Sequence, residues 1–324
     1  MSQSIRFHAT GTPDVLQLET LSVGEPGPGE VRLRHTAIGV NFIDTYQRSG
    51  LYPIQLPSGL GSEAAGVVEA LGPGVSHLAV GDRVAYAGGP LGAYSTRRLI
   101  PAAVLVKLPD SISDDVAACI MLQGMTVEYL IRRTFAVKPG MTVLWHAAAG
   151  GVGQIAVQWL HALGVQVIGT VGSAAKGELA AQLGCQHVIN YSEDDVVARV
   201  RDITGGKGVP VVYDSVGKST FEMSLNSLAP RGTFVSFGNA SGAVPAFEPL
   251  LLSQKGSLFF TRPKLADYIA SREELDASAQ ALFERIASGA VKVSPSASYA
   301  LADAAQAHRD LEARRTTGSI ILKP

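Results

Sequence analysis

The 324-residue sequence lacks the features that mark several large classes of protein. Its only cysteines are Cys119 and Cys185, which are too few for a disulfide framework or a Cys-x-x-Cys metal site. A reducing compartment, the cytoplasm, is therefore the expected location. The N-terminal segment has no apolar run typical of a signal peptide, and no stretch approaches the roughly 18 apolar residues of a membrane span. The sequence predicts a soluble chain.

An excess of charge of either sign is also missing. Lys and Arg number 27 against 28 Asp and Glu, which gives a net charge of −1. No cluster of basic residues interleaved with aromatics is present, so a nucleic acid partner is not expected. The absence of a Gly-x-Ser-x-Gly pattern argues against a hydrolase of that type. A small neutral or anionic ligand is the expected partner.

The middle of the chain, from Met141 to about Pro263, alternates short apolar segments with stretches of helical periodicity. The apolar segments are MTVLWHAAA, VQVIGTV, HVINY, VPVVYDSV, GTFVSFG and SLFFTR. Strands that alternate with helices are typical of a doubly wound parallel sheet, so the fold class is α/β. Helix starts are expected after the capping residues Ser173 and Ser192, with Asp195 as a capping-box partner of Ser192. Helix ends are expected at Gly164 and Gly184.

The segments on either side of this region differ from it in composition and in hydrophobic pattern. Residues 1–125 carry dense glycine and proline between short β-like segments, which predicts a mostly β domain with irregular loops. After Pro263, amphipathic helices are expected around residues 271–289 and 301–315, followed by the apolar ending SIILKP.

The segment HAAAGGVGQIA, residues 146–156, places glycines between an expected strand and an expected helix. Within it, Gly151, Val152, Gly153 and Ala156 form a G-x-G-x-x-A pattern. The first glycine permits a tight turn, the second lets a pyrophosphate approach the backbone, and the small Ala156 lets the helix pack on the strand. The N–H groups at the start of the helix can donate to phosphate oxygens. The sequence therefore predicts a dinucleotide-binding turn.

Several segments together resemble a known family. They are HAAAGGVG, AIGVNFIDTYQRSGLYP, LPSGLGSEAAGVV, GDRVAY, VVYDSVG and SFGNASG. The chain resembles the zeta-crystallin-like quinone oxidoreductases of the medium-chain dehydrogenase/reductase superfamily over nearly its whole length. This resemblance implies a GroES-like, mostly β domain from residues 1–125 and 264–324 and a Rossmann domain from residues 126–263. It also implies a cofactor in the cleft between the domains and a homodimer.

The second strand of the expected Rossmann domain indicates which nicotinamide is used. In NAD enzymes an acidic residue about 20 residues past the glycines accepts the ribose hydroxyls. Here that place is taken by Gly172 and Ser173, and the first acid is Glu178 on the following helix. Ser173 can donate to a 2′-phosphate and Lys176 can pair with its charge. By resemblance, Tyr191 lies beside the same phosphate. NADPH is the expected cofactor.

The resemblance implies further residues near the nicotinamide half of the cofactor, which are Phe237, Gly238, Asn239, Arg262 and Arg314. The segment NFIDTYQRSGLYP supplies candidates for the substrate side of the cleft. We predict roles for Asn41, which also contacts the cofactor, and for Tyr46 and Tyr52, with Asp44 and Gln123 as further lining candidates. A phenol hydroxyl can donate to a carbonyl oxygen as negative charge develops on it.

The zinc-dependent alcohol dehydrogenases of the same superfamily hold their catalytic metal with a cysteine and with the histidine of a Gly-His-Glu segment. The corresponding places here read GVNF, with Asn41, and GSEAAG, with Ser62 before Glu63. Residues 85–105 contain no cysteine for a structural zinc lobe. Zinc requires thiolate, imidazole or carboxylate ligands, so no metal is expected.

Without a metal to polarise an alkoxide, the expected substrate is one that accepts hydride readily. The leading hypothesis is an NADPH-dependent quinone reductase. A zinc-free reductase of alkenals and enones shares the architecture and stays an alternative, as does a non-catalytic nucleotide- or RNA-binding protein. The physiological acceptor and the choice between one- and two-electron reduction stay open.

Three other features are interpreted as structural. Ser113 is an expected N-cap with Asp114 and Asp115 in the first turn, where carboxylates suit the helix dipole. Cys119 is expected to be a packed thiol. His146, at a strand end beside the glycine turn, is expected to serve packing instead of chemistry.

Overall fold

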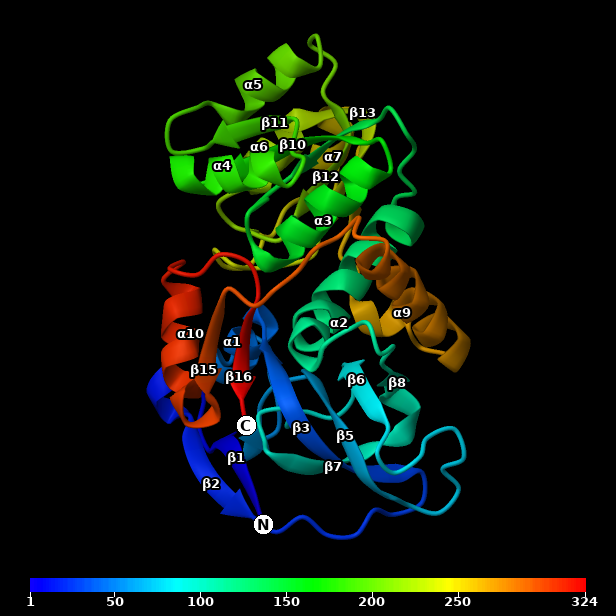
Figure 1. Cartoon of the computed structure of the whole chain (residues 1–324). Helices are drawn as coiled ribbons and strands as arrows, with labels where there is room; N and C mark the ends of the chain where they lie inside the picture. The colour runs from blue at the N-terminus through cyan, green and yellow to red at the C-terminus, as the bar shows by residue number, and fades with distance from the viewer. The chain divides into compact units, whose positions relative to one another are not determined.

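Both ends of the chain fold into one unit, and the middle of the chain folds into another (Figure 1). The computed structural model describes all 324 residues. The terminal unit consists of Met1–Met125, Ile269–Ala287 and Val293–Pro324. The central unit consists of Thr126–Tyr268 and Ser288–Lys292. Relative to the division expected from the sequence, the central unit also takes in residues 264–268 and 288–292.

The central unit contains a six-stranded sheet with the order β11-β10-β9-β12-β13-β14, in which every pair is parallel. Its strands are β9 (Thr142–Trp145), β10 (Gln166–Val171), β11 (His187–Asn190), β12 (Val209–Asp214), β13 (Leu228–Ser236) and β14 (Phe259–Thr261). All six apolar segments singled out in the sequence form these strands, so the predicted doubly wound sheet is confirmed. The strand order reverses between β9 and β12, which is where such sheets bind their ligands.

Helices connect these strands by crossovers, which are right-handed almost without exception in parallel sheets. They are α3 (Gly151–Ala162), α4 (Ala174–Gln182), α5 (Val196–Ile203) and α6 (Phe221–Ser227), with the shorter α7 (Leu250–Gln254) and α8 (Leu265–Tyr268) near the end of the unit. The reversal of strand order moves the helices to the other face, and Figure 1 shows α3 and α4 on one side of the sheet and α5 on the other. A π-helical turn covers Leu130–Thr134.

The helix boundaries follow the capping signals with one exception. Ser173 caps α4 by accepting from the N–H of Lys176, and Gly164 and Gly184 adopt positive φ just after α3 and α4. The expected N-cap Ser192 is wrong. Asp195 caps α5 instead, because its carboxylate accepts from the N–H of Ala198 at 3.1 Å.

The terminal unit is mostly β, as predicted. Its larger sheet has the order β15-β16-β3-β5-β6-β8, with β7 also paired to β3, and its smaller sheet has the order β2-β1-β4. The strands are β1 (Ser2–Phe7), β2 (Gln17–Leu21), β3 (Glu30–Val40), β4 (Ser58–Gly59), β5 (Glu63–Leu71), β6 (Arg83–Ala87), β7 (Arg97–Pro101), β8 (Val106–Lys107), β15 (Ala297–Ala300) and β16 (Ile320–Lys323). Because β16 pairs antiparallel to β3, the end of the chain completes a sheet that its beginning starts.

The helices of this unit surround its sheets. They are α1 (Phe42–Ser49), α9 (Arg272–Ala287) and α10 (Ala304–Glu312), with α2 (Asp114–Tyr129) running across the sequence junction between the units. Short 3₁₀ turns cover Pro13–Val15, Ala102–Val104 and Leu301–Asp303. The two C-terminal helices expected from the sequence are confirmed as α9 and α10.

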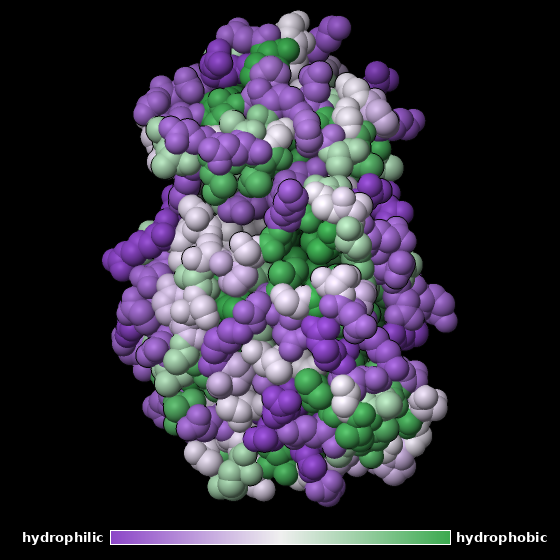
Figure 2. All heavy atoms as spheres, in the orientation of Figure 1, coloured by the Kyte–Doolittle hydropathy of each residue, from purple (hydrophilic) through white to green (hydrophobic).

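Each unit has its own hydrophobic core. One core is centred on residues such as Phe7, Leu33 and Tyr94 in the terminal unit, and another on residues such as Leu144 and Phe234 in the central unit. On the face shown in Figure 2, hydrophilic residues predominate over both units, and hydrophobic residues occupy smaller areas. No helix in the structure combines the length and the apolar character that a membrane span requires.

Candidate active site

The turn between β9 and α3 carries the predicted dinucleotide fingerprint. Helix α3 begins at Gly151 and is preceded by Gly150, which provides no side-chain cap. The first N–H groups of an α-helix have no acceptor within the helix, so those of α3 can donate to a phosphate. A Cβ atom on Gly153 would lie 2.3 Å from the carbonyl oxygen of Ala147 and 2.7 Å from that of Ala148. Gly153 is therefore required by the close approach of helix and turn, and the turn fits a pyrophosphate.

A network of buried polar side chains lies next to this turn in the core of the central unit. His146 is fully buried, and its Nδ1 and Nε2 contact the hydroxyls of Thr170 (2.9 Å) and Ser224 (3.0 Å). Because Ser224 donates to Asp214 (2.8 Å), it accepts from Nε2–H, and Nδ1 accepts from Thr170. Desolvation lowers the pKa of His146, which keeps the ring neutral. The structural interpretation of His146 is confirmed.

Asp214 is a residue that the sequence reasoning missed. It ends β12, is fully buried, and accepts from the backbone N–H groups of Val216 (2.7 Å) and Gly217 (3.0 Å) in addition to Ser224. An aspartate at the end of an apolar strand and before a Ser-Val-Gly turn was the available signal. Asp214 therefore fixes the turn at the carboxyl end of β12.

The residues predicted to hold a 2′-phosphate lie together at the carboxyl ends of β10 and β11. A Cβ atom on Gly172 would lie 2.4 Å from the hydroxyl oxygen of Tyr191, so the tyrosine covers this glycine. The hydroxyl of Ser173 accepts from the N–H of Lys176 at 3.4 Å and keeps its own hydrogen for another acceptor. The site combines hydroxyl and cationic donors without a carboxylate at the ribose position, so it fits a phosphate better than a ribose diol.

The residues assigned to the nicotinamide half follow β13 and β14. The N–H of Phe237 donates to the Asp214 carbonyl (2.8 Å), and Arg262 donates to the Ser236 carbonyl (2.9 Å). A Cβ atom on Gly238 would lie 2.4 Å from the carbonyl oxygen of Ser215. Because the carboxyl ends of parallel strands share one edge of a sheet, these residues and Asn239 lie at the same edge as the fingerprint turn.

In the terminal unit, the three predicted catalytic residues lie on or beside α1. Asn41 precedes the helix, Tyr46 lies within it, and Tyr52 follows it. The rings of Tyr46 and Tyr52 meet edge to face with centroids 5.2 Å apart, and the N–H of Tyr52 donates to the Tyr46 carbonyl at 3.0 Å. The structure thus brings Tyr46 and Tyr52 together, and it places Asn41 at the start of the same helix.

The side chain of Asn41 is held from two sides. Its Nδ2 donates to Glu63 Oε2 at 2.6 Å, and its Oδ1 accepts from Gln123 Nε2 at 3.0 Å. Glu63 is fully buried, and this desolvation raises its pKa to about 8 despite the hydrogen bonds from Asn41 and from the N–H of Leu122. Glu63 was not among the predicted site residues, because nothing in a linear sequence shows which side chain it contacts.

Asp44 was expected to line the site, and the structure corrects this. It is fully buried and accepts from the backbone N–H of Asn41 and from the hydroxyl of Tyr94, both at 2.8 Å. Asp44 therefore acts as the acidic partner of the capping arrangement at the start of α1. Desolvation raises its pKa to about 7. The Tyr94 hydroxyl also contacts Nε2 of His308 on α10 at 3.1 Å.

An ion pair between the buried Arg48 and the partly exposed Glu312 fixes α1 further. Arg48, in the last turn of α1, makes two hydrogen bonds to Glu312 at the end of α10, at 2.6 and 3.0 Å. The predicted cofactor residue Arg314 follows α10 directly and adopts a positive φ of 57°. Arg48, Glu312 and Arg314 all belong to the terminal unit.

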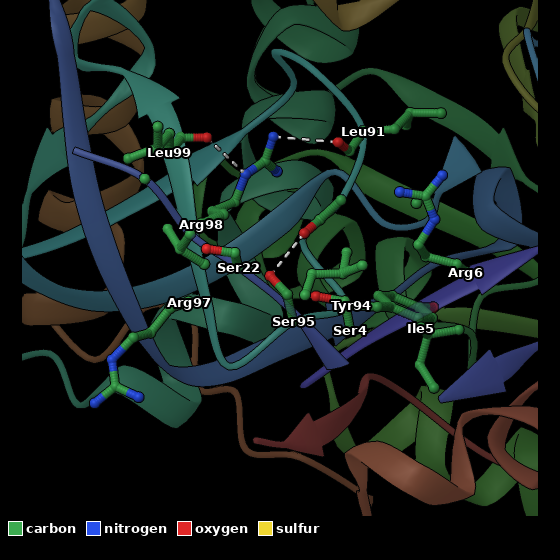
Figure 3. A pocket seen from close by; sticks show the side chains of 15 residues that line it. Ser4, Ile5, Arg6, Ser22, Leu91, Tyr94, Ser95, Arg97, Arg98 and Leu99 are labelled. Carbon is green, nitrogen blue, oxygen red and sulfur yellow. Dashed lines mark hydrogen bonds between the residues drawn. The ribbon is translucent and has the colours of Figure 1, made fainter. Parts of the chain in front are cut away.

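A separate cavity of about 280 Å³ opens in the terminal unit (Figure 3). It is lined by residues of β1, β7 and neighbouring loops, and none of the predicted site residues lines it. Figure 3 shows Arg98 between Leu91 and Leu99, to whose backbone carbonyls it donates at 3.2 and 3.3 Å. Arg97 hydrogen bonds to Glu69. These two guanidinium groups are therefore already used by contacts within the fold.

Comparison with known proteins agrees with the fold and the fingerprint. Residues 27–110 match the model of the alcohol dehydrogenase GroES-like domain, and residues 151–284 match that of the zinc-binding dehydrogenase family. A quinone oxidoreductase of Pseudomonas aeruginosa is 55% identical over the full length of both chains. A 2-haloacrylate reductase of Burkholderia is 49% identical over 98% of each chain. The crystal structure of Escherichia coli quinone oxidoreductase complexed with NADPH superposes with a TM-score of 0.98 at 52% identity, covering 99% of this chain and 100% of that chain.

The fold and the fingerprint define an oxidoreductase of the medium-chain dehydrogenase/reductase superfamily. Within this superfamily, the chain belongs to the quinone oxidoreductase family, as the sequence resemblance predicted.

The raised pKa of Asp44 predicts a pH-dependent stability. Its folded value, about 7, exceeds its ordinary value of 3.8, so the unfolded chain binds fewer protons between these values. The contribution of Asp44 is thus fully present below pH 4 and is lost as the pH rises through 7. We expect the free energy of unfolding to fall between pH 5 and 8 by about 2–4 kcal/mol more in the natural chain than in Asp44→Asn.

Urea unfolding at pH 5, 6, 7 and 8 measures this difference. His35 and His308, whose pKa values burial lowers to about 3, act in the opposite direction as the pH falls. Both are kept in the variant, as is Glu63, whose pKa is raised to about 8 by burial and in part by the charge of Asp44, so the difference between the two proteins reports Asp44 together with its effect on Glu63. Parallel pH curves for the two proteins would contradict the assignment.

Proposed function

We propose that the chain reduces quinones with NADPH as the hydride donor and without a metal ion. The observation that carries this proposal is the combination of a pyrophosphate-binding turn with a phosphate-binding group at the ribose position, in a chain 52–55% identical to quinone oxidoreductases. NADPH when bound supplies the hydride, and the protein supplies binding, orientation and hydrogen bonds.

Different residues bind different parts of the cofactor. The N–H groups at Gly151, Val152 and Gly153 hold the pyrophosphate, and Ser173 and Lys176 hold the 2′-phosphate with Gly172 and Tyr191 beside it. Phe237, Gly238, Asn239 and Arg262 shape the nicotinamide end, and Arg314 adds a cation from the terminal unit.

On the substrate side, Asn41 positions the nicotinamide and the acceptor, and Tyr46 and Tyr52 donate hydrogen bonds to a quinone oxygen as negative charge develops on it. The proton that completes quinol formation comes from solvent or from a tyrosine hydroxyl.

Catalysis without zinc is supported by the residues at the positions where zinc-dependent relatives hold their metal. One position is Asn41, whose amide is already hydrogen bonded on both sides, and the other is Ser62. Neither residue type is a ligand that zinc prefers. A substrate that needs no Lewis acid, such as a quinone, is consistent with this set.

A second candidate function is the reduction of activated alkenes. The 49% identity to a 2-haloacrylate reductase favours this alternative, because that relative has the same length and architecture. A non-catalytic nucleotide- or RNA-binding role is the third, and it is the least supported because the net charge is −1.

Steady-state oxidation of NADPH with 1,4-benzoquinone, a naphthoquinone, 2-haloacrylate and an alkenal tests the three functions. We expect turnover with quinones that exceeds that with the alkenes and that survives exhaustive chelation, with no stoichiometric zinc in elemental analysis. Faster reduction of an alkene would favour the second function. An absence of turnover with every acceptor would contradict both enzymatic functions. Loss of activity when one zinc ion per chain is removed would contradict metal independence.

Lys176 tests the choice of NADPH. Lys176→Ala should raise the Michaelis constant for NADPH roughly tenfold, which is about 1–2 kcal/mol, because a partly solvated ion pair with the 2′-phosphate is lost. The constant for NADH should stay nearly unchanged. Lys207→Ala, at an exposed lysine of the same unit, is the matched control and should change neither constant. Equal use of NADH and NADPH by the natural chain would overturn the proposed specificity.

We also propose that the protein is a homodimer and works in the cytoplasm. Strand β14 ends the central sheet, and Phe259 on it is 62% exposed. An open strand edge with an exposed aromatic ring is a ready surface for pairing with a second copy. The cytoplasmic location is supported by two free, buried cysteines in a chain without disulfides.

Sedimentation velocity tests the dimer. Phe259→Asp should shift the protein toward a monomer, because a charge on the strand edge opposes burial in an interface. Val80→Asp, at an equally exposed residue in the terminal unit, should leave the dimer intact. A natural chain that sediments as a monomer at micromolar concentration would refute the proposal.

A further inference from the structure

Four buried polar side chains of the terminal unit form one continuous chain of hydrogen bonds. Ser319 Oγ donates to Gln123 Oε1 at 2.8 Å, Gln123 Nε2 donates to Asn41 Oδ1 at 3.0 Å, and Asn41 Nδ2 donates to Glu63 Oε2 at 2.6 Å. Each side chain is less than a tenth exposed. All donors point in the same direction, toward Glu63.

The Ser319 end of this series of hydrogen bonds does not determine the direction in which they donate. The Ser319 hydroxyl lies within reach of a second acceptor, the carbonyl oxygen of Cys119, at 3.4 Å. A hydroxyl can donate in one direction and accept from another. If both amides were turned over, Gln123 Nε2 could donate to Ser319, and Ser319 could donate to Cys119. The Ser319 end therefore allows the hydrogen bonds to donate in either direction.

The Glu63 end permits only one direction when the carboxyl group is ionised. Glu63 Oε1 accepts from the backbone N–H of Leu122 at 2.7 Å, and a backbone N–H cannot reverse its role. The ionised group has no hydrogen to offer, so Oε2 must also accept. Gly39 of β3 leaves room for the carboxyl group, because a Cβ atom there would lie only 2.4 Å from Oε2.

We infer that Glu63 is a positioning residue that sets the orientation of the Asn41 carboxamide and thereby which polar atom of Asn41 faces the bound ligand. Two of the polar capacities of Asn41 are used by Glu63 and Gln123. The second hydrogen on Nδ2 is not used by either partner, and turning the amide over moves it to the other side of the carboxamide. The inference rests on the proposed role of Asn41 in binding the nicotinamide and the acceptor.

Glu63→Gln gives the direct test. In this variant the side-chain oxygen stays with the Leu122 N–H, so the new amide nitrogen occupies the place of Oε2 and needs an acceptor. Asn41 can supply one only by turning over, and Gln123 and Ser319 can follow. The variant should therefore fold, and above a pH of about 8, where Glu63 of the natural chain is ionised, its kcat/KM for NADPH and quinone should fall at least tenfold. The affinity for 2′,5′-ADP, which lacks the nicotinamide, should stay unchanged.

Ser319→Ala is the matched control, because it removes one hydrogen bond at the end that does not set the direction. It should lower kcat/KM less than threefold. Above a pH of about 8, activity of Glu63→Gln within threefold of the natural chain, or equal losses in the two variants, would overturn the inference.

The pH profile separates positioning from simple packing. Below a pH of about 8 the Glu63 carboxyl group is neutral and its hydroxyl can donate a hydrogen bond. Glu63 then no longer requires Asn41 to be the donor. In the natural chain kcat/KM should rise through that pH, and in Glu63→Gln the rise should be absent. The neighbouring groups that interact with Glu63 are Asp44, Tyr86, Tyr94 and Cys119. Asp44 is kept in both proteins, and burial raises the pKa values of the other three above this range. Identical pH profiles would overturn the inference.

A stability cycle tests the orientation independently of activity. In the double variant Asn41→Asp with Glu63→Gln, the introduced carboxylate can accept from the introduced amide and from Gln123, so all donors are satisfied again. Asn41→Asp alone brings two buried carboxyls together. The double variant should melt several degrees above either single variant. If the double variant melts no higher than the single variants, the inference fails, and this result holds even if Glu63→Gln alone does not fold. A natural chain without activity would count against the proposed function and not against this inference.

Discussion

The close approach of α3 to the turn after β9 is the contact on which the central unit depends. No side chain fits at Gly153, because the carbonyl oxygens of Ala147 and Ala148 occupy the space that a Cβ atom would need. Ala147 itself adopts a positive φ of 55°, which costs a non-glycine residue about 1 kcal/mol. This strained turn places the start of α3 at the carboxyl edge of the sheet, where its free N–H groups face outward.

Buried polar groups connect the two strands next to this turn. His146, Ser224 and Asp214 satisfy one another and connect the ends of β9 and β12 on both sides of the point where the strand order reverses. An unsatisfied buried polar group would cost about 1–3 kcal/mol, so each partner makes the others necessary. The same edge then carries every residue of the central unit that we assign to the cofactor.

The terminal unit uses buried acids for a comparable purpose. Asp44 caps α1 and ties it to Tyr94, and Glu63 holds Asn41 at the start of the same helix. Burying carboxyl groups is unfavourable, and the raised pKa values of both residues record that cost. The gain is a fixed position for Asn41, whose amide could otherwise adopt either of two orientations. Both units thus place their functional groups on rigid helix starts and support them with polar groups in the core.

Local signals in the sequence determined the strands of the central sheet, the fingerprint turn, the helix start at Ser173 and the helix ends at Gly164 and Gly184. Each depends on residues that are close in the chain, such as a glycine that tolerates positive φ or a serine that caps the next turn. The choice between Ser192 and Asp195 was missed because both are capping residues, and only the path of the chain after β11 decides between them. The roles of Asp44 and Glu63 were decided by the tertiary structure, and so was that of Asp214, although its place between an apolar strand and a Ser-Val-Gly turn was a local signal. Their partners include Tyr94, Leu122 and Ser224, and a buried carboxyl acquires its role from the donors that the folded chain brings to it.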